Sequence, residues 1–155
     1  MIEELYRRER PGLLRLAVLL IGDRVLAEDI VQDAFMALHK HWPRLADPSG
    51  AGAYLRVSVI NGARSAHRRQ AVSARHLRAE PSLDPPTDAS LLLAEEHQAV
   101  LKAVRRLPRR QQEVLVLRYW AGLSEAEIAT TLGVSRGTVK TCAARALATL
   151  EARLS

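Results

Sequence analysis

A proline-rich stretch near the middle of the chain limits what either half can fold into. Residues 71–89 include Pro81, Pro85 and Pro86 among serine, threonine and aspartate. Such a composition does not propagate a helix and buries little apolar surface. We therefore predict a flexible linker here, with a small domain on each side of it. The predicted domains are residues 1–70 and residues 90–155.

The rest of the chain favours helices over strands. β-Branched residues seldom alternate with polar ones, and no Asn-Gly or Asp-Gly pair joins two such runs into a hairpin. Aromatic residues make up only 4% of the chain, so leucine, valine, isoleucine and alanine must fill the core. We predict an all-α fold of two small helical domains.

Composition points toward a polyanionic partner and away from a membrane. The formal net charge is +6, which suits nucleic acid because lysine and arginine neutralise phosphates. The apolar run at 13–21 is interrupted by Arg15 and is far shorter than the roughly 20 residues that cross a bilayer. We expect a buried helix there, with no signal peptide and no membrane insertion. Cys142 is the single cysteine, so we expect a cytoplasmic protein with neither disulfide nor metal.

Three helices are predicted in the first domain. Pro11 suits the first turn of a helix that ends at Ile21, and a third helix is expected over about 53–69. The helix between them, over 24–41, has two distinct faces. Its apolar face consists of Ala27, Ile30, Val31, Ala34, Phe35 and Leu38. The opposite face is acidic and consists of Glu28, Asp29, Gln32, Asp33 and Met36.

The acidic face has two interpretations. It repels phosphate and would suit a basic protein partner, or it is an ordinary solvated helix face, which periodicity alone favours. The polar end of the third helix also has two interpretations. Its polar side chains either cap the helix, because basic groups favour the negative end of the macrodipole, or form a nucleic-acid surface. They are Asn61, Arg64, Arg68 and Arg69.

The second domain contains a helix-turn-helix pattern after two helices predicted over 90–107 and 109–120. Ser124 and Glu127 match a capping box. Gly133 suits the positive φ of a tight turn, and Ser135 suits the cap of the next helix. Ala129 is small enough for a second helix to cross closely, and the shared core is predicted to be Ile128, Leu132, Val134 and Val139. Such spacing predicts a second helix that lies in the major groove of DNA.

The recognition helix that follows Ser135 has an inner and an outer face. The inner face is predicted to be Val139, Ala143, Ala146, Leu150 and Leu154. On the outer side, Thr138, Thr141 and Arg145 have groups that reach base edges, whereas Arg136 and Lys140 suit phosphates. Cys142 lies beside the inner face and is interpreted as a small packed residue rather than a redox switch.

Five stretches resemble one known family. LPRRQQEVLVLRY (107–119), GLSEAEIA (122–129) and GVSRGTVKT (133–141) look like the −35-reading domain of bacterial sigma-70 family factors. GDRVLAEDIVQDAF (22–35) and AYLRVSVIN (53–61), with the arginine-rich end that follows, look like their −10-binding domain. Two domains in this order with a short linker resemble the extracytoplasmic-function (ECF) class.

The resemblance implies an initiation factor that is not an enzyme and needs no cofactor or catalytic residue. In that family the acidic helix docks on the clamp helices of the β′ subunit of core RNA polymerase, with β as a further contact. The −10 element is bound partly as unpaired, flipped-out bases, which suits the arginine-rich end of the third helix. No intermediate domain is expected, and no extension after Ser155, so regulation would come from outside, from an anti-sigma factor.

Two other functions remain open. A free-standing helix-turn-helix regulator would bind its operator tightly without polymerase. A nucleic-acid enzyme would need a metal-binding carboxylate cluster, and Asp29 and Asp33 lie one helical turn apart as such a cluster might. No histidine or lysine nearby supports that enzyme, so we expect it least.

Overall fold

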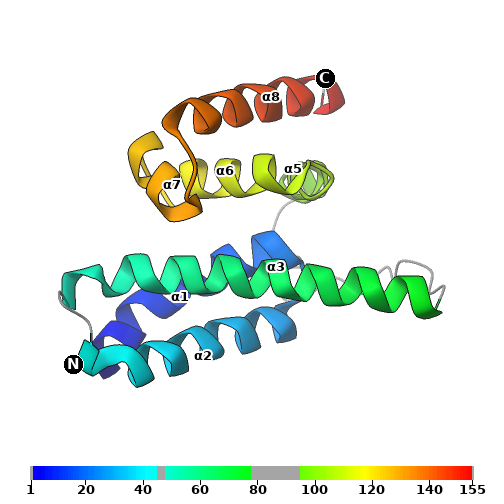
Figure 1. Cartoon of the computed structure of the whole chain (residues 1–155). Helices are drawn as coiled ribbons and strands as arrows, with labels where there is room; N and C mark the ends of the chain where they lie inside the picture. Colours follow the sequence, from blue (N-terminus) through cyan, green and yellow to red (C-terminus); the bar gives the residue numbers. More distant parts are fainter. Residues whose placement is uncertain (1, 45–47, 78–94, 155) are drawn as a thin grey trace. The chain divides into compact units, whose positions relative to one another are not determined.

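The computed structural model describes residues 2–44, 48–77 and 95–154. Within these ranges the regular secondary structure is helical throughout, which confirms the all-α prediction. The chain divides into two compact units, Met1–Ala89 and Ser90–Ser155, whose helices are labelled in Figure 1.

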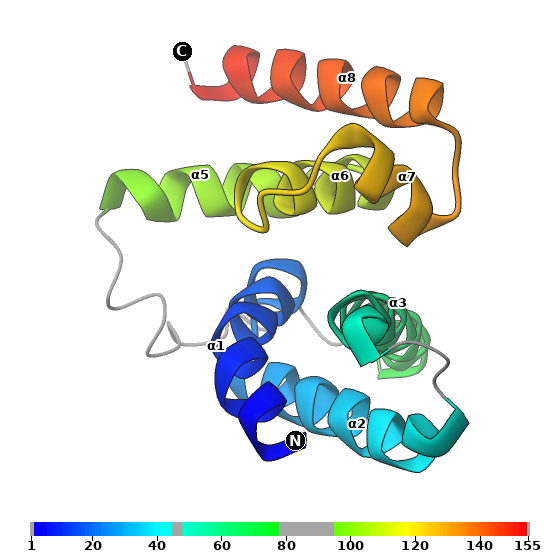
Figure 2. The same ribbon diagram turned by 90° about the vertical axis from the view of Figure 1, so that its left-hand side faces the viewer.

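The first unit is a bundle of three helices. They are α1 (Ile2–Ile21), α2 (Arg24–His41) and α3 (Ala51–Leu77), and each packs on the other two. Figure 2 shows α1 and α3 crossing above α2. Short 3-10 turns at Trp42–Arg44 and Pro48–Gly50 precede α3.

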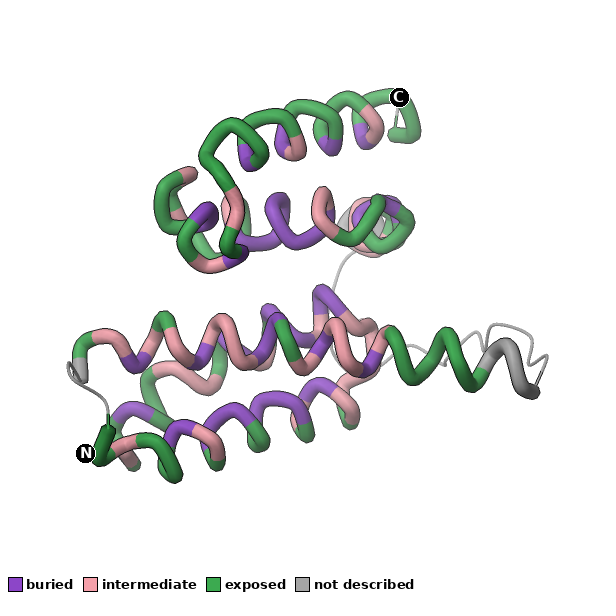
Figure 3. The backbone as a smooth tube through the Cα atoms, viewed as in Figure 1, coloured by how far each residue is buried: buried purple, intermediate pink, exposed green. Residues whose placement is uncertain are grey.

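The core of this unit lies between the apolar faces of the helices, which Figure 3 marks in purple. Leu38 and Leu55 are wholly buried. Asp23 caps α2 by accepting a hydrogen bond from the backbone N–H of Leu26 at 3.2 Å. The predicted bounds of α2 are correct, and so is its predicted apolar face. The residues of that face, Ala27, Ile30, Val31, Ala34, Phe35 and Leu38, are all buried.

Helix α1 begins nine residues earlier than predicted, because Pro11 lies inside it and not in its first turn. A proline inside a helix removes one backbone hydrogen bond. Tertiary packing offsets this loss. Leu5 is buried, and the Tyr6 ring lies 4.8 Å from the ring of Phe35 on α2.

Helix α3 continues to Leu77, so the predicted linker is wrong for residues 71–77. These residues contain neither proline nor glycine, and nothing in them ends a helix. The prolines that end helical structure all lie further along the chain, so they do not limit residues 71–77. The remainder of the predicted linker and the start of the helix expected from 90 lie outside the described residues.

A close crossing joins α3 to α2. A Cβ built on Gly62 would lie 2.8 Å from Cγ2 of Ile30, closer than two carbon atoms can approach without a shift. Glycine therefore allows α3 to pack on the buried face of α2. The close contact at Gly62 therefore determines how near the middle of α3 lies to α2.

The second unit is built around α6 (Arg109–Tyr119). Its residues Val114 to Leu117 are all buried. Helix α8 (Arg136–Leu154) packs against α5 (Glu95–Arg105), α6 and α7 (Glu125–Leu132). Gly122 and Gly133 have φ of 69° and 70° in the turns before and after α7, a backbone conformation that favours glycine.

Candidate nucleic-acid interface

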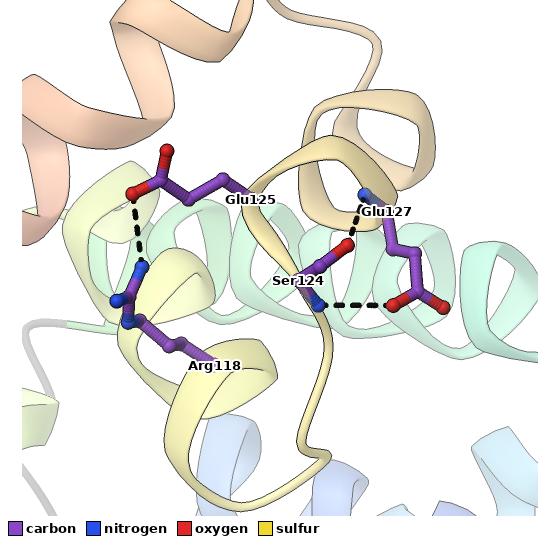
Figure 4. Close-up of polar contacts among 4 residues, drawn as sticks. All are labelled: Arg118, Ser124, Glu125 and Glu127. Carbon is purple, nitrogen blue, oxygen red and sulfur yellow. Dashed lines mark hydrogen bonds and ion pairs between the residues drawn. The ribbon is translucent and has the colours of Figure 1, made fainter.

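The start of α7 is fixed by the predicted capping box, which Figure 4 shows. The Ser124 hydroxyl accepts a hydrogen bond from the backbone N–H of Glu127 at 3.1 Å, and the Glu127 carboxylate accepts one from the backbone N–H of Ser124 at 3.0 Å. Arg118 at the end of α6 forms an ion pair of 3.1 Å with Glu125. Backbone and side-chain bonds together therefore set the position of α7 against α6.

The turn between α7 and α8 has the features that the sequence predicts. Gly133 is left-handed, and the Ser135 hydroxyl accepts a hydrogen bond from the backbone N–H of Thr138 at 3.1 Å. The Ser135 and Thr138 hydroxyl oxygens are also 2.9 Å apart. From α6, Arg110 reaches the Leu132 carbonyl at 3.5 Å. Arg109 beside it is exposed, but partial desolvation lowers its pKa, an effect that Glu113 opposes.

Helix α8 presents the predicted polar residues to solvent. Val139, Ala143, Ala146 and Leu150 are buried against the unit, as predicted. Leu154 is 47% exposed, so its predicted burial is wrong, because it is the last residue of a helix that frays at its end. Cys142 is half-buried. The side chains predicted to bind DNA are all exposed: Arg136, Thr138, Lys140, Thr141 and Arg145.

The acidic face of α2 is also mostly exposed. Asp29, Gln32, Asp33 and Met36 are in solvent, with Met36 63% exposed. Glu28 is half-buried and pairs with Arg24 at 3.2 Å, so part of its charge is neutralised. Sequence reasoning missed Val25, which is 71% exposed and lies one turn before Asp29. An apolar residue four positions from an exposed acid was the signal that could have found it.

On α3, the predicted residues do not all share one direction. Asn61 and Arg68 are exposed and Arg64 is half-buried. At about 100° per residue, these three side chains leave within roughly 60° of one another, and we call them the α3 strip. Arg69 is exposed but leaves about 140° from Arg64, so it lies at the opposite edge of the helix.

Neither a metal site nor a membrane-spanning helix is found in the described part of the chain. No three histidine, cysteine, aspartate or glutamate side chains of that part gather as a metal site requires. No helix in it has the length and apolar character needed to cross a membrane.

Known proteins match both units. The family model described as sigma-70 region 2 matches residues 5–73, and the one described as sigma-70, region 4 matches residues 97–150. RNA polymerase sigma-E factor of Streptomyces avermitilis is 37% identical over 98% of this chain and 84% of its own length. The chain belongs to the sigma-70 family. It is a sigma factor, which binds RNA polymerase and directs it to promoters.

Other relatives place this sigma factor in the ECF class. ECF RNA polymerase sigma factor SigL of Mycobacterium tuberculosis is 30% identical over 90% of the chain and 81% of its own length. Among solved structures, CnrH in complex with the cytosolic domain of CnrY has a TM-score of 0.75 at 26% identity and covers 99% of this chain and 86% of that one. Sigma factor RpoE of Bartonella quintana, solved with the anti-sigma factor NepR, shares the fold with a TM-score of 0.77 at 22% identity, covering 98% of this chain and 95% of that one.

Proposed function

We propose that this sigma factor docks on core RNA polymerase through the acidic face of α2. The exposure of Asp29, Gln32 and Asp33 carries the proposal, because such a face repels phosphate in a protein whose net charge is +6 and suits a basic protein surface. The clamp helices of β′ are the expected partner, with β as a further contact. Exposed Met36 and Val25 add apolar area to the same face, and Glu28 borders it.

The remaining polar surfaces bind promoter DNA in this proposal. The α3 strip, with Arg69 at its edge, holds the melted −10 element, since unpaired bases need both polar groups and phosphate contacts. Helix α8 enters the major groove of the −35 element, where Thr138, Thr141 and Arg145 face bases. Arg136 and Lys140 bind phosphates. Residues 1–70 thus serve polymerase and the −10 element, and residues 90–155 the −35 element.

Strand opening in this scheme is driven by binding energy, without a catalytic residue or a cofactor. We expect the protein to act in the cytoplasm beside RNA polymerase. CnrH, its 26% identical structural neighbour, was solved with the cytosolic domain of CnrY. A protein partner of a comparable kind, an anti-sigma factor, would therefore be expected to regulate this chain.

The first test mixes the purified full chain with core RNA polymerase and a promoter template. We expect a stable complex and a promoter-dependent transcript, with poor promoter binding by the chain alone. Tight and specific DNA binding without polymerase, with no transcript, would instead show a free-standing helix-turn-helix regulator.

The second test changes Asp29 and Asp33 together to asparagine, which removes two charges without loss of volume. Affinity for core polymerase should fall more than tenfold, whereas weak binding of the full chain to a −35 duplex should not fall, because the loss of two negative charges does not weaken binding to phosphate. A matched control changes Glu3 and Glu4, two exposed acids on α1, to glutamine. Equal polymerase affinity in both double variants would show that α2 is not the docking surface.

A further inference from the structure

His67 lies where α3 leaves the body of the first unit. Ala66 before it is 1% exposed, whereas every residue from 68 to 73 is exposed. Figure 3 shows this change along α3, where purple and pink give way to a green stretch that extends past the bundle. His67 itself is half-buried. It is therefore among the last residues through which α3 can be held to the bundle.

A hydrogen bond from His67 joins α3 to α1 within this unit. Nε2 of His67 lies 3.0 Å from the backbone carbonyl oxygen of Leu20. Because a carbonyl only accepts, Nε2 carries the proton and donates it. Leu20 is the second-last residue of α1, and its carbonyl is one of the four at a helix end that have no partner within the helix. One bond thus caps α1 and joins α3 to it.

The residues around His67 belong to the proposed DNA-binding surface. Arg64 precedes it by three positions and Arg68 follows it directly, and Arg68 donates a hydrogen bond of 3.0 Å to Ser65. A change in the tilt of α3 at His67 would therefore move Arg68 relative to the rest of the unit, and a rotation of α3 about its axis would turn Arg64 as well. Such a change would not alter the exposed face of α2.

We propose that His67 is a positioning residue for −10 DNA. It contacts no base. Through its bond to Leu20 it holds the arginines of the α3 strip in the orientation needed to stabilise the opened strand. The inference rests on the proposed role of the α3 strip in binding the −10 element, and extends it to a residue that faces the bundle instead of the DNA.

The test uses holoenzyme assembled from core polymerase and full-chain variants. His67→Asn removes the donor, because its amide is too short to reach, whereas the amide nitrogen of His67→Gln can take the place of Nε2. His39→Asn is the matched control, because His39 is an exposed histidine on α2. Open-complex formation is measured on a duplex promoter, together with core affinity and the unfolding temperature of the chain.

We expect His67→Asn to lower open-complex formation about tenfold, the size of one hydrogen bond of ordinary strength. His67→Gln should restore most of it, and His39→Asn should match the unchanged protein. Core affinity should stay the same in all three. Equal loss in the Asn and Gln variants would overturn the proposal, and so would a His67→Asn variant that loses core affinity as much as open complex.

A parallel variant separates this inference from the function on which it rests. Arg64→Ala combined with Arg68→Ala removes two arginines of the α3 strip directly. If that variant opens promoters normally, the −10 surface itself is wrongly assigned. If it fails to open them while His67→Asn succeeds, the surface is right and only the positioning role of His67 is wrong.

Discussion

Arg136 and Arg145 are both exposed on α8 but leave the helix in different directions. Arg145 follows Thr141 by four residues and shares its outward face, whereas Arg136 directly follows the Ser135 cap. A side chain on the outward face can read a base edge, and one at the first turn is better placed for a phosphate. The same charge therefore has two different expected roles.

Removing each arginine should separate specificity from affinity. Arg145→Ala should weaken binding of the holoenzyme to its own −35 element by about 1–3 kcal/mol and have little effect on an altered element. Arg136→Ala should weaken binding to every sequence and reduce the slope of log affinity against log salt by about one. Fluorescence anisotropy over a salt series measures both effects. A uniform loss with Arg145→Ala would identify it as a phosphate contact.

At the scale of helices, replacing either of two helical glycines by alanine should change the stability of the chain in opposite directions. In Gly62→Ala, the new methyl group would meet Cγ2 of Ile30 at 2.8 Å. Ile30 is buried and branched at Cβ, so it has no room to turn away. Overpacking costs about 1–3 kcal/mol, more than the gain of about 1 kcal/mol from helix propensity. We expect a lower unfolding temperature.

Gly12→Ala in α1 is the matched control. A Cβ at Gly12 would meet no atom within 4 Å, so only helix propensity changes, and the variant should be more stable by about 0.5–1 kcal/mol. Thermal unfolding followed by circular dichroism compares the two variants. If Gly62→Ala were as stabilising as Gly12→Ala, the close crossing of α2 and α3 would be wrong.

The capping box of α7 should contribute to the stability of the unit that carries the recognition helix. Ser124→Ala leaves the backbone N–H of Glu127 without its acceptor, and we expect a loss of about 0.5–2 kcal/mol in the free energy of unfolding. Ser124→Asp supplies another acceptor and should retain most of the stability of the unchanged chain. Chemical denaturation measures both. Equal stability of the Ala variant and the unchanged chain would show that the cap does not contribute.

The helices that depend on local signals could be predicted from the sequence, and those that depend on packing could not. Ser124 and Ser135 mark helix starts in the sequence, and both form the expected caps. The true start of α1 depends on Leu5 and Tyr6 meeting a distant helix, which no local pattern reports. His67 was missed for the same reason, because its partner lies 47 residues away.

At the scale of the whole molecule, each unit has a core of its own. Leu38 in the first and Leu117 in the second are both 0% exposed. In the first unit α1, α2 and α3 pack on one another, and in the second α8 packs on α5, α6 and α7. A cavity made by substitution in one core should therefore reduce protection from hydrogen exchange first in the unit that contains it.

Leu38→Ala and Leu117→Ala test this expectation as a pair. Each should cost about 2–5 kcal/mol through lost burial and a residual cavity. Hydrogen exchange read by mass spectrometry should show faster exchange in α1, α2 and α3 for the first variant, and in α5 to α8 for the second. Faster exchange in both units from either single change would mean that the two cores unfold together.

The opposite charges of α2 and α3 also have a consequence for how the first unit approaches other molecules. Its acidic face and its arginines are carried by different helices of one bundle, so the unit is an electric dipole. A nucleic acid exerts a torque that turns α3 toward it, and a basic protein exerts a torque that turns α2 toward it. Both torques fade beyond about 8 Å at physiological salt, so the unit is oriented only in the last step before contact.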